Sequence, residues 1–593
     1  MFFAVVLALG GLGAWYAAAS IDPIQLTKLL SSTVKASTGR DLRISGPVRL
    51  SIFPSIGVKA EQVSLSNTNW ASDSQMLSVK QIELDVKLFP LFAKRVEVSK
   101  INLAGLEVHL QTNQLGLGNW DLASPASTAT KSGSTTSDRL ASADEESNLV
   151  GIESIQITDA RITYQSGNSP QKVITIPQLS IKGEGSKTAV LLDLQYADYK
   201  LGLKGKTSSL RQAIMDWDQS PVNMNLDLTL NLNGKSLDIG GKIDKTPKAL
   251  TQFDIKLESK SFDLLPLAAG AAASGSQKSA ASSKPASVQG RYFFSDQALP
   301  LNLLPSANGK IEFKIAQLGV PAQAPLKNVY ANIVFKEDRL DINDLKFEVG
   351  KGQANAQISL SQLHSAAPHI SLKGLAKNFT LEQIVVSRDS SAQMSGGDAQ
   401  IAVNLSGKGN SLHQIVGGAN GVAQMTVGKA RLDSKLLNTA GDLAVTILNT
   451  LNPMRKTSSQ TILECAVIYL PVSNGIVNVN DSVGVETDKL NIVLSGTVNL
   501  NNEVINLNIN PHDKTGLTTG VDLGGLVKLE GTLQNPKAGV SKEGVVNSAV
   551  TIGLGFLTGG ISIAAENAKS LTTKRQPCKN ALHPWTDIYP GSN

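Results

Sequence analysis

The residues that could carry chemistry form no complete catalytic motif. The triplets Gly205-Lys206-Thr207 and Gly234-Lys235-Ser236 end like a P-loop, but Lys200 and Thr229 stand where its first glycine belongs. We interpret both triplets as turns at strand ends. The sequence contains no Gly-x-Ser-x-Gly, so it lacks the nucleophile elbow of the α/β hydrolases. We therefore predict a protein that is not an enzyme and uses no cofactor.

Histidines and acidic residues show no spacing typical of a metal site. The six histidines are scattered, and only two of them, on either side of Pro368, are close in sequence; they are His109, His364, His369, His413, His512 and His583. The acidic triplet Asp144-Glu145-Glu146 lies in a Ser/Thr-rich stretch, where a solvated run of charge is the simpler interpretation. We predict no metal site.

Two cysteines, Cys465 and Cys578, remain. They are far apart and form no C-x-x-C motif, and a structural zinc site needs about four ligands. In an oxidising compartment they can form one disulfide bridge, and the alternative is two unrelated thiols.

Composition excludes nucleic acid as a partner. The net charge is +6, charged residues make up 18% of the chain, and aromatic residues only 5%. The chain therefore lacks both the basic excess that binds phosphates and the aromatic platforms that stack on bases.

The chain begins with an uncharged apolar run, Phe2–Ala19, at the lower limit of length for a membrane span. We predict a membrane anchor over residues 1–21. The alternative is a cleaved signal peptide, since Ala17-Ala18-Ala19-Ser20 would suit the cleavage site. Either interpretation places the remaining chain outside the cytoplasm.

Two low-complexity stretches rich in Ala and Ser divide the body, at 123–148 and 268–289. Such segments bury too little apolar surface to fold, so we interpret them as linkers. The predicted modules are then residues 22–122, 149–267 and 290–541, followed by an apolar helix and tail over 542–593.

Alternation of apolar and polar residues dominates these modules. In Ile82–Leu88 and Met224–Leu232 every second residue is apolar, which predicts strands with one apolar and one wet face. The same pattern predicts further strands at Ile152–Tyr164, Val173–Ile181, Leu326–Phe335, Leu340–Val349, Ala399–Leu405, Leu490–Leu500 and Val504–Ile509.

Few segments have helical spacing. Asp22-Pro23 predicts the start of a helix that Gly39 ends, and Leu432–Leu451 carries apolar residues on one helical face. Val545–Ala565 is uncharged and of spanning length, yet it contains several glycines, so we predict a terminal cap in preference to a membrane segment. We expect these amphipathic helices to cap the sheet.

The predicted fold is therefore all-β with few helices. Too few helices exist to cover so many apolar strand faces, which leaves a sandwich, a closed barrel or an open curled sheet. Composition does not distinguish among these.

Several segments in collinear order resemble the bacterial AsmA family. They are Ser37–Gly46, Phe53–Val58, Leu88–Phe92, Val96–Val98, Gly118-Asn119-Trp120, Ile152–Tyr164, Leu412–Leu432, Glu464-Cys465-Ala466, Asn474-Gly475 and Leu529–Pro536. The resemblance covers nearly the whole chain. It implies a long curved antiparallel sheet that forms an open hydrophobic groove behind an N-terminal transmembrane helix.

The resemblance also implies a function. It suggests a single-pass protein of the inner membrane of a Gram-negative bacterium, with its body in the periplasm, that takes part in outer-membrane biogenesis. Members of the wider superfamily move phospholipid through a bridge-like channel, so phospholipid and the inner membrane are the expected partners, with envelope proteins as further ones. The alternative is a non-enzymatic scaffold or regulator of outer-membrane protein assembly and targeting.

Two sets of site residues follow from this interpretation. Since the periplasm is oxidising, we expect a disulfide between Cys465 and Cys578. The one-sided strands would supply the lipid-binding surface, for which Leu84, Val86, Leu226 and Leu228 are the candidates.

Overall fold

The protein is described by a computed structural model. It describes residues 31–32, 34–35, 38–51, 56–87, 98–113, 116–121, 152–167, 169–264, 292–320, 324–384, 394–433, 460–488, 490–514, 527–540 and 576–590. The chain divides into two compact units, Met1–Thr251 and Gln252–Asn593. The predicted linkers, the run Phe2–Ala19 and the segment Val545–Ala565 lie outside the described residues, and the module boundaries stay predictions.

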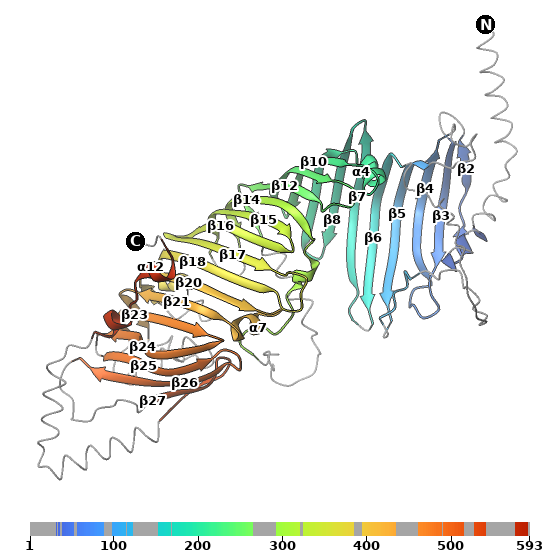
Figure 1. Cartoon of the computed structure of the whole chain (residues 1–593). Helices are drawn as coiled ribbons and strands as arrows, with labels where there is room; N and C mark the ends of the chain where they lie inside the picture. The colour runs from blue at the N-terminus through green and yellow to red at the C-terminus, as the bar shows by residue number, and fades with distance from the viewer. Residues whose placement is uncertain are drawn as a thin grey trace, which may run out of the picture. The chain divides into compact units, whose positions relative to one another are not determined.

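The first unit is an open sheet whose strands follow one another in sequence order (Figure 1). The short strands β1 and β2 both pair with β3, and from β3 onward each strand pairs with the next. The strands are β1 (Leu42–Ile44), β2 (Val48–Ser51), β3 (Ile56–Ser66), β4 (Gln75–Val86), β5 (Val98–Thr112), β6 (Ser154–Ser166), β7 (Lys172–Glu184), β8 (Lys187–Tyr196), β9 (Tyr199–Ser208), β10 (Val222–Leu232) and β11 (Lys235–Lys245).

A line of residues with left-handed backbone conformation crosses the first strands of this unit. Gln62, Gly105 and Asp159 have positive φ angles of 53°, 63° and 53°, and the pairing of β3, β4, β5 and β6 is interrupted beside them. A Cβ atom on Gly105 would lie 2.5 Å from the Lys80 side chain, so glycine fits this position best. One residue of each paired strand is passed over here, so the register of β3, β4 and β5 continues while the alternation of faces changes phase along each strand.

The described part of the first unit contains two helical segments. Residue Gly39, with φ of 71°, ends the helical turn before β1 and donates from its backbone N to Lys35 O at 2.9 Å, which confirms the predicted helix end. Helix α4 (Leu210–Asp216) connects β9 to β10, and the Ser209 hydroxyl caps it by accepting from the backbone N–H of Gln212.

The second unit also consists mainly of β-strands, with a few short helices. Its strands are β12 (Gln252–Ser259), β13 (Phe262–Asp263), β14 (Ala307–Gly319), β15 (Leu326–Glu337), β16 (Arg339–Val349), β17 (Gly352–Ser361), β18 (His369–Phe379), β19 (Met394–Gly396), β20 (Ala399–Lys408), β21 (Asn420–Val427), β22 (Ala430–Asp433), β23 (Gln460–Ser473), β24 (Ile476–Thr487), β25 (Leu490–Asn499), β26 (Val504–Asp513), β27 (Val527–Thr532) and β28 (Pro536–Val540). Its short helices are η2 (Pro300–Leu303), α6 (Leu381–Ile384), α7 (Leu412–Gly417), α11 (Pro577–Ala581) and α12 (Trp585–Ile588).

The all-β prediction is confirmed, with three corrections. The sheets are mixed and not purely antiparallel, because β5 runs parallel to β6 and β14 runs parallel to β12 and β13. Leu432, predicted to begin a helix, lies in strand β22. Of the two Gly-Lys triplets, Gly234 forms the β10–β11 turn as expected, whereas Gly205 lies inside β9.

None of the helices in the described stretches has the length and hydropathy of a membrane span.

The largest hydrophobic core belongs to the second unit. It gathers the side chains on one face of β24 to β27, where Ile492, Ile509 and Leu529 are fully buried, and it extends to β16–β18. We call this group the core cluster.

Candidate functional site: the apolar face of the first unit

The strand register of the first unit aligns apolar side chains into continuous rows. One row runs from β3 to β11 through directly paired residues: Val58, Leu84, Ile101, Ile155, Ile181, Val190, Gly205, Leu228 and Ile239. A second row lies beside it: Ala60, Ile82, Leu103, Ile157, Leu179, Leu192, Leu203, Leu230 and Leu237. Paired residues project to the same side of a sheet, so both rows form one surface, which we call the apolar face.

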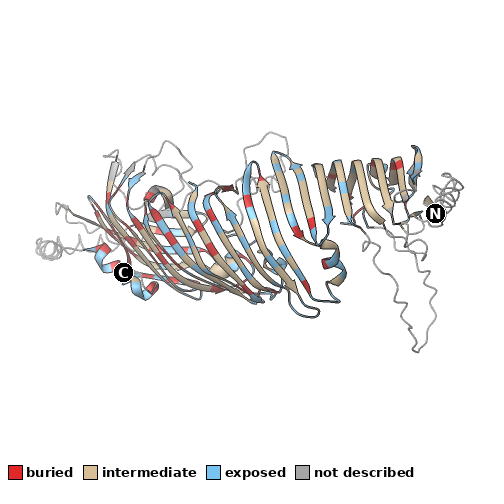
Figure 2. Cartoon of the chain, turned by 90° about the horizontal axis from the view of Figure 1, so that it is seen from above, coloured by how far each residue is buried: buried red, intermediate tan, exposed pale blue. Residues whose placement is uncertain are grey.

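The apolar face is left partly exposed. Every residue of the first row is only half-buried, and in the second row only Ala60 and Leu237 are buried. Figure 2 shows the contrast, with intermediate burial predominating on the strands nearest the N-terminus and buried residues more frequent toward the C-terminus. Extended apolar rows that remain partly open to solvent are uncommon on a protein that has no partner for them.

The opposite face of the same strands is polar. Asn102 donates to Glu83 Oε2 at 3.3 Å across β4 and β5, and Thr229 donates to Asp238 Oδ1 at 2.9 Å across β10 and β11. An exposed ion pair joins Lys206 and Glu184 at 3.0 Å. The alternation along each strand therefore separates a wet face from an apolar one, as predicted.

Two features bound the apolar face along the strands. At one end, α4 contacts β10, and the backbone N–H of its first residue, Leu210, donates to Thr188 Oγ1 of β8 at 3.0 Å. At the other end, the Trp120 ring lies 6.2 Å from the ring of Tyr164, which is paired with Leu110.

A buried asparagine fixes the loop that carries Trp120. Asn119 is completely buried; its Oδ1 accepts from the backbone N–H of Gln111 at 2.9 Å, and its Nδ2 donates to Asn67 Oδ1 at 3.0 Å. The carbonyl of Asn119 accepts from the Arg40 guanidinium at 3.1 Å. The Gly-Asn-Trp segment thus closes this end of the sheet with satisfied hydrogen bonds.

The candidate residues from the sequence lie as follows. Leu84 and Leu228 belong to the same row, on β4 and β10, and Leu226 lies two residues from Leu228 on the same face. Val86 pairs with Val98 through its backbone, and its side chain is outside the described part of the structure. Sequence reasoning did not select Ile101, Ile155, Ile181, Val190 and Ile239, although their alternation was visible.

The structure joins Cys465 to Cys578 in a disulfide, with 6.4 Å between the Cα atoms. The Glu486 carboxylate lies beside it, and these three residues are the one potential metal-ligand group among the described residues, with both sulfurs engaged in the bridge. Of the two neighbouring histidines, His364 pairs with Asp338, and His369 begins β18.

Residues 1–182 and 206–482 match the family model of the AsmA family. The chain belongs to the AsmA family. The AsmA match includes most strands of the apolar face and ends within β24, so that β25–β28 and Cys578 lie beyond it. No curated protein and no solved structure matches the chain.

Proposed function

We propose that this AsmA-family protein binds the acyl chains of phospholipids on the apolar face of its first unit. The observation that carries the proposal is the pair of apolar rows, continuous across β3–β11 and only half-buried. Covering such a surface is favourable by about 25 cal/mol for each Å² of apolar area removed from water. The opposite, polar face needs no cover.

The dimensions of the face suit lipid tails. At about 4.8 Å between neighbouring strands, a row from β3 to β11 is about 38 Å long. One leaflet of a bilayer with a hydrocarbon core of ~30 Å is about 15 Å thick. Each row therefore has the length of more than two lipid tails placed end to end.

We place this activity in the periplasm, in outer-membrane biogenesis, on a protein anchored to the inner membrane and acting without enzymatic chemistry. The uncharged run Phe2–Ala19 supports the anchor, and the Cys465–Cys578 disulfide supports an oxidising compartment. Binding of acyl chains along a strand-crossing row would let the protein carry or conduct phospholipid.

Native mass spectrometry of the full chain, extracted in mild detergent and followed by lipid identification, tests the proposal. We expect co-purifying phospholipid, and we expect it to decrease when a charge is placed on the apolar face. A protein free of lipid that instead retains outer-membrane assembly factors would favour a scaffold role.

A further inference from the structure

The C-terminal segment Gln576–Pro590 crosses one face of the second unit, and we call it the strap. It includes α11 and α12 and lies against β18, β20, β21, β23 and β24 (Figure 1). On β23 the strap contacts Cys465, Val467 and Tyr469, whereas the alternate residues Ala466 and Ile468 pack on the core cluster. The strap and the core cluster therefore lie on opposite faces of the same strands.

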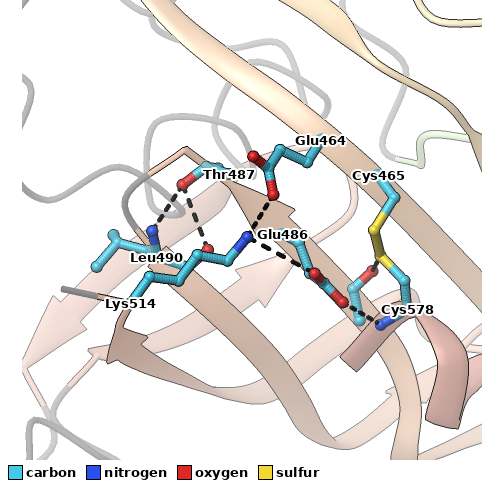
Figure 3. Close-up of a disulfide and its surroundings, with 8 residues drawn as sticks. Glu464, Cys465, Glu486, Thr487, Leu490, Lys514 and Cys578 are labelled. Carbon is cyan, nitrogen blue, oxygen red and sulfur yellow. Dashed lines mark hydrogen bonds and ion pairs between the residues drawn. A yellow bond between two sulfur atoms is a disulfide. The ribbon is translucent and has the colours of Figure 1, made fainter. Parts of the chain in front are cut away.

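The disulfide fixes the first turn of the strap (Figure 3). The backbone N–H of Cys578 donates to Glu486 Oε1 at 3.2 Å, and Lys514 forms ion pairs with Glu486 at 3.6 Å and Glu464 at 2.5 Å. A Cβ atom on Gly484 would lie 2.3 Å from Pro577 O, so a glycine on β24 allows the strap to approach this closely.

A buried glutamine binds the backbone in the middle of the strap. Gln424 on β21 is 1% exposed; its Nε2 donates to His583 O at 3.0 Å, and its Oε1 accepts from the backbone N–H of His583 at 2.9 Å. The His583 ring stacks on Tyr469 at 3.7 Å. Leaving a buried amide unpaired is costly, so the polar side chain of Gln424 matches a sheet face that is covered by the strap.

The last turn of the strap adds an apolar contact. Ile588 is 1% exposed and packs with Leu375 of β18 and Ala402 of β20, and Trp585 and Tyr589 adjoin them. The strap thus contacts five strands, β24, β23, β21, β20 and β18, and runs across them.

From these contacts we propose that the strap is a redox-controlled brace. It holds the strands of the second unit at one curvature, and the Cys465–Cys578 disulfide locks it in place. A dithiol reductant opens the lock: the disulfide takes up two electrons and two protons to give two thiols, and the reductant becomes a disulfide. Release then frees β20, β21 and β23 to move and uncovers Leu375 and Ala402.

Hydrogen–deuterium exchange on the full chain tests this device, with oxidised protein compared with protein reduced by dithiothreitol. On reduction we expect exchange in 578–590 to rise by at least about tenfold, with a parallel rise in β20, β21 and β23. The β10–β11 hairpin of the first unit serves as the internal control and should not change.

Two results would overturn the proposal. A strap that stays protected after reduction would show that the disulfide is not its lock. A strap that exchanges freely while β20, β21 and β23 stay unchanged would show that it braces nothing. The double variant Cys465→Ser, Cys578→Ser gives the same comparison without reductant, and reduction of the folded protein decides the matter if that variant fails to fold.

Discussion

Placing a carboxylate on the apolar face, with Leu228→Asp, should remove lipid while leaving the fold intact. Leu228 is mostly buried between Gly205 and Ile239, so its replacement loses most of the ~1.5–3 kcal/mol of a fully buried leucine, or about 1–3 kcal/mol of stability. When an acyl chain covers the new side chain, the carboxylate is either buried as a charged group or protonated before it is buried.

The cost for the lipid is larger. Protonating an aspartate with a pKa of about 3.9 at pH 7 costs about 4 kcal/mol, which corresponds to a roughly thousandfold loss of affinity at that position. The assay is the amount of phospholipid that co-purifies with each variant, together with its urea unfolding midpoint.

The matched control is Asn231→Asp, on the same strand and the opposite face. Its new carboxylate can still accept from the backbone N–H of Gly234, which Asn231 Oδ1 accepts at 2.9 Å. Thr229 is a poorer choice, because its partner is the carboxylate of Asp238 and the two charges would repel. Equal lipid content in wild type, control and Leu228→Asp would refute the reasoning.

Further outcomes follow from other parts of the molecule. Gly105→Val should cost about 1–3 kcal/mol, because its φ of 63° is strained for a β-branched residue, whereas Gly240→Val, in open space, should cost little; urea unfolding compares them. The Asp338 carboxylate, which accepts a hydrogen bond from the His364 ring, raises the pKa of His364 above 6.5, so the stability that the pair contributes is complete below pH 6.5 and is lost as the pH rises through the higher folded value. NMR titration should place the His364 midpoint above 6.5 and show a lower midpoint in Asp338→Asn, in which the hydrogen bond to Leu304 O remains; an unshifted midpoint in the wild type would contradict this. Mature protein should retain Phe2–Ala19 and fractionate with the inner membrane, and N-terminal sequencing that begins at Ser20 would show cleavage instead.

Strand positions could be predicted because alternation is a local property of the chain. The predicted segments Met224–Leu232 and Leu326–Phe335, for example, lie within β10 and β15. The same rule fails where a strand residue has a positive φ angle, because residues of the apolar face are then three apart, as Ala60 and Val63 or Leu103 and Leu106 show. A residue in the left-handed region shifts the phase of the alternation, and the residue type alone does not reveal it.

Long-range arrangement was harder to predict. The parallel pairing of β5 with β6 follows from a long connection whose path no local pattern encodes. The two cysteines predict a disulfide that joins the C-terminal segment to the sheet. No periodicity in the sequence marks Gln424 as the residue that binds the strap backbone. A buried polar residue of this kind becomes understandable only when its partner, His583, is seen beside it.

If lipid lies on one face of the first unit, a photocrosslinking scan along β10 in living cells detects it most directly. Photoreactive residues at Leu226, Leu228 and Leu230 should form phospholipid adducts, and those at the alternate positions Asp227, Thr229 and Asn231 should not. Adducts with proteins alone at every apolar position, or lipid adducts of equal yield on both faces, would contradict the account.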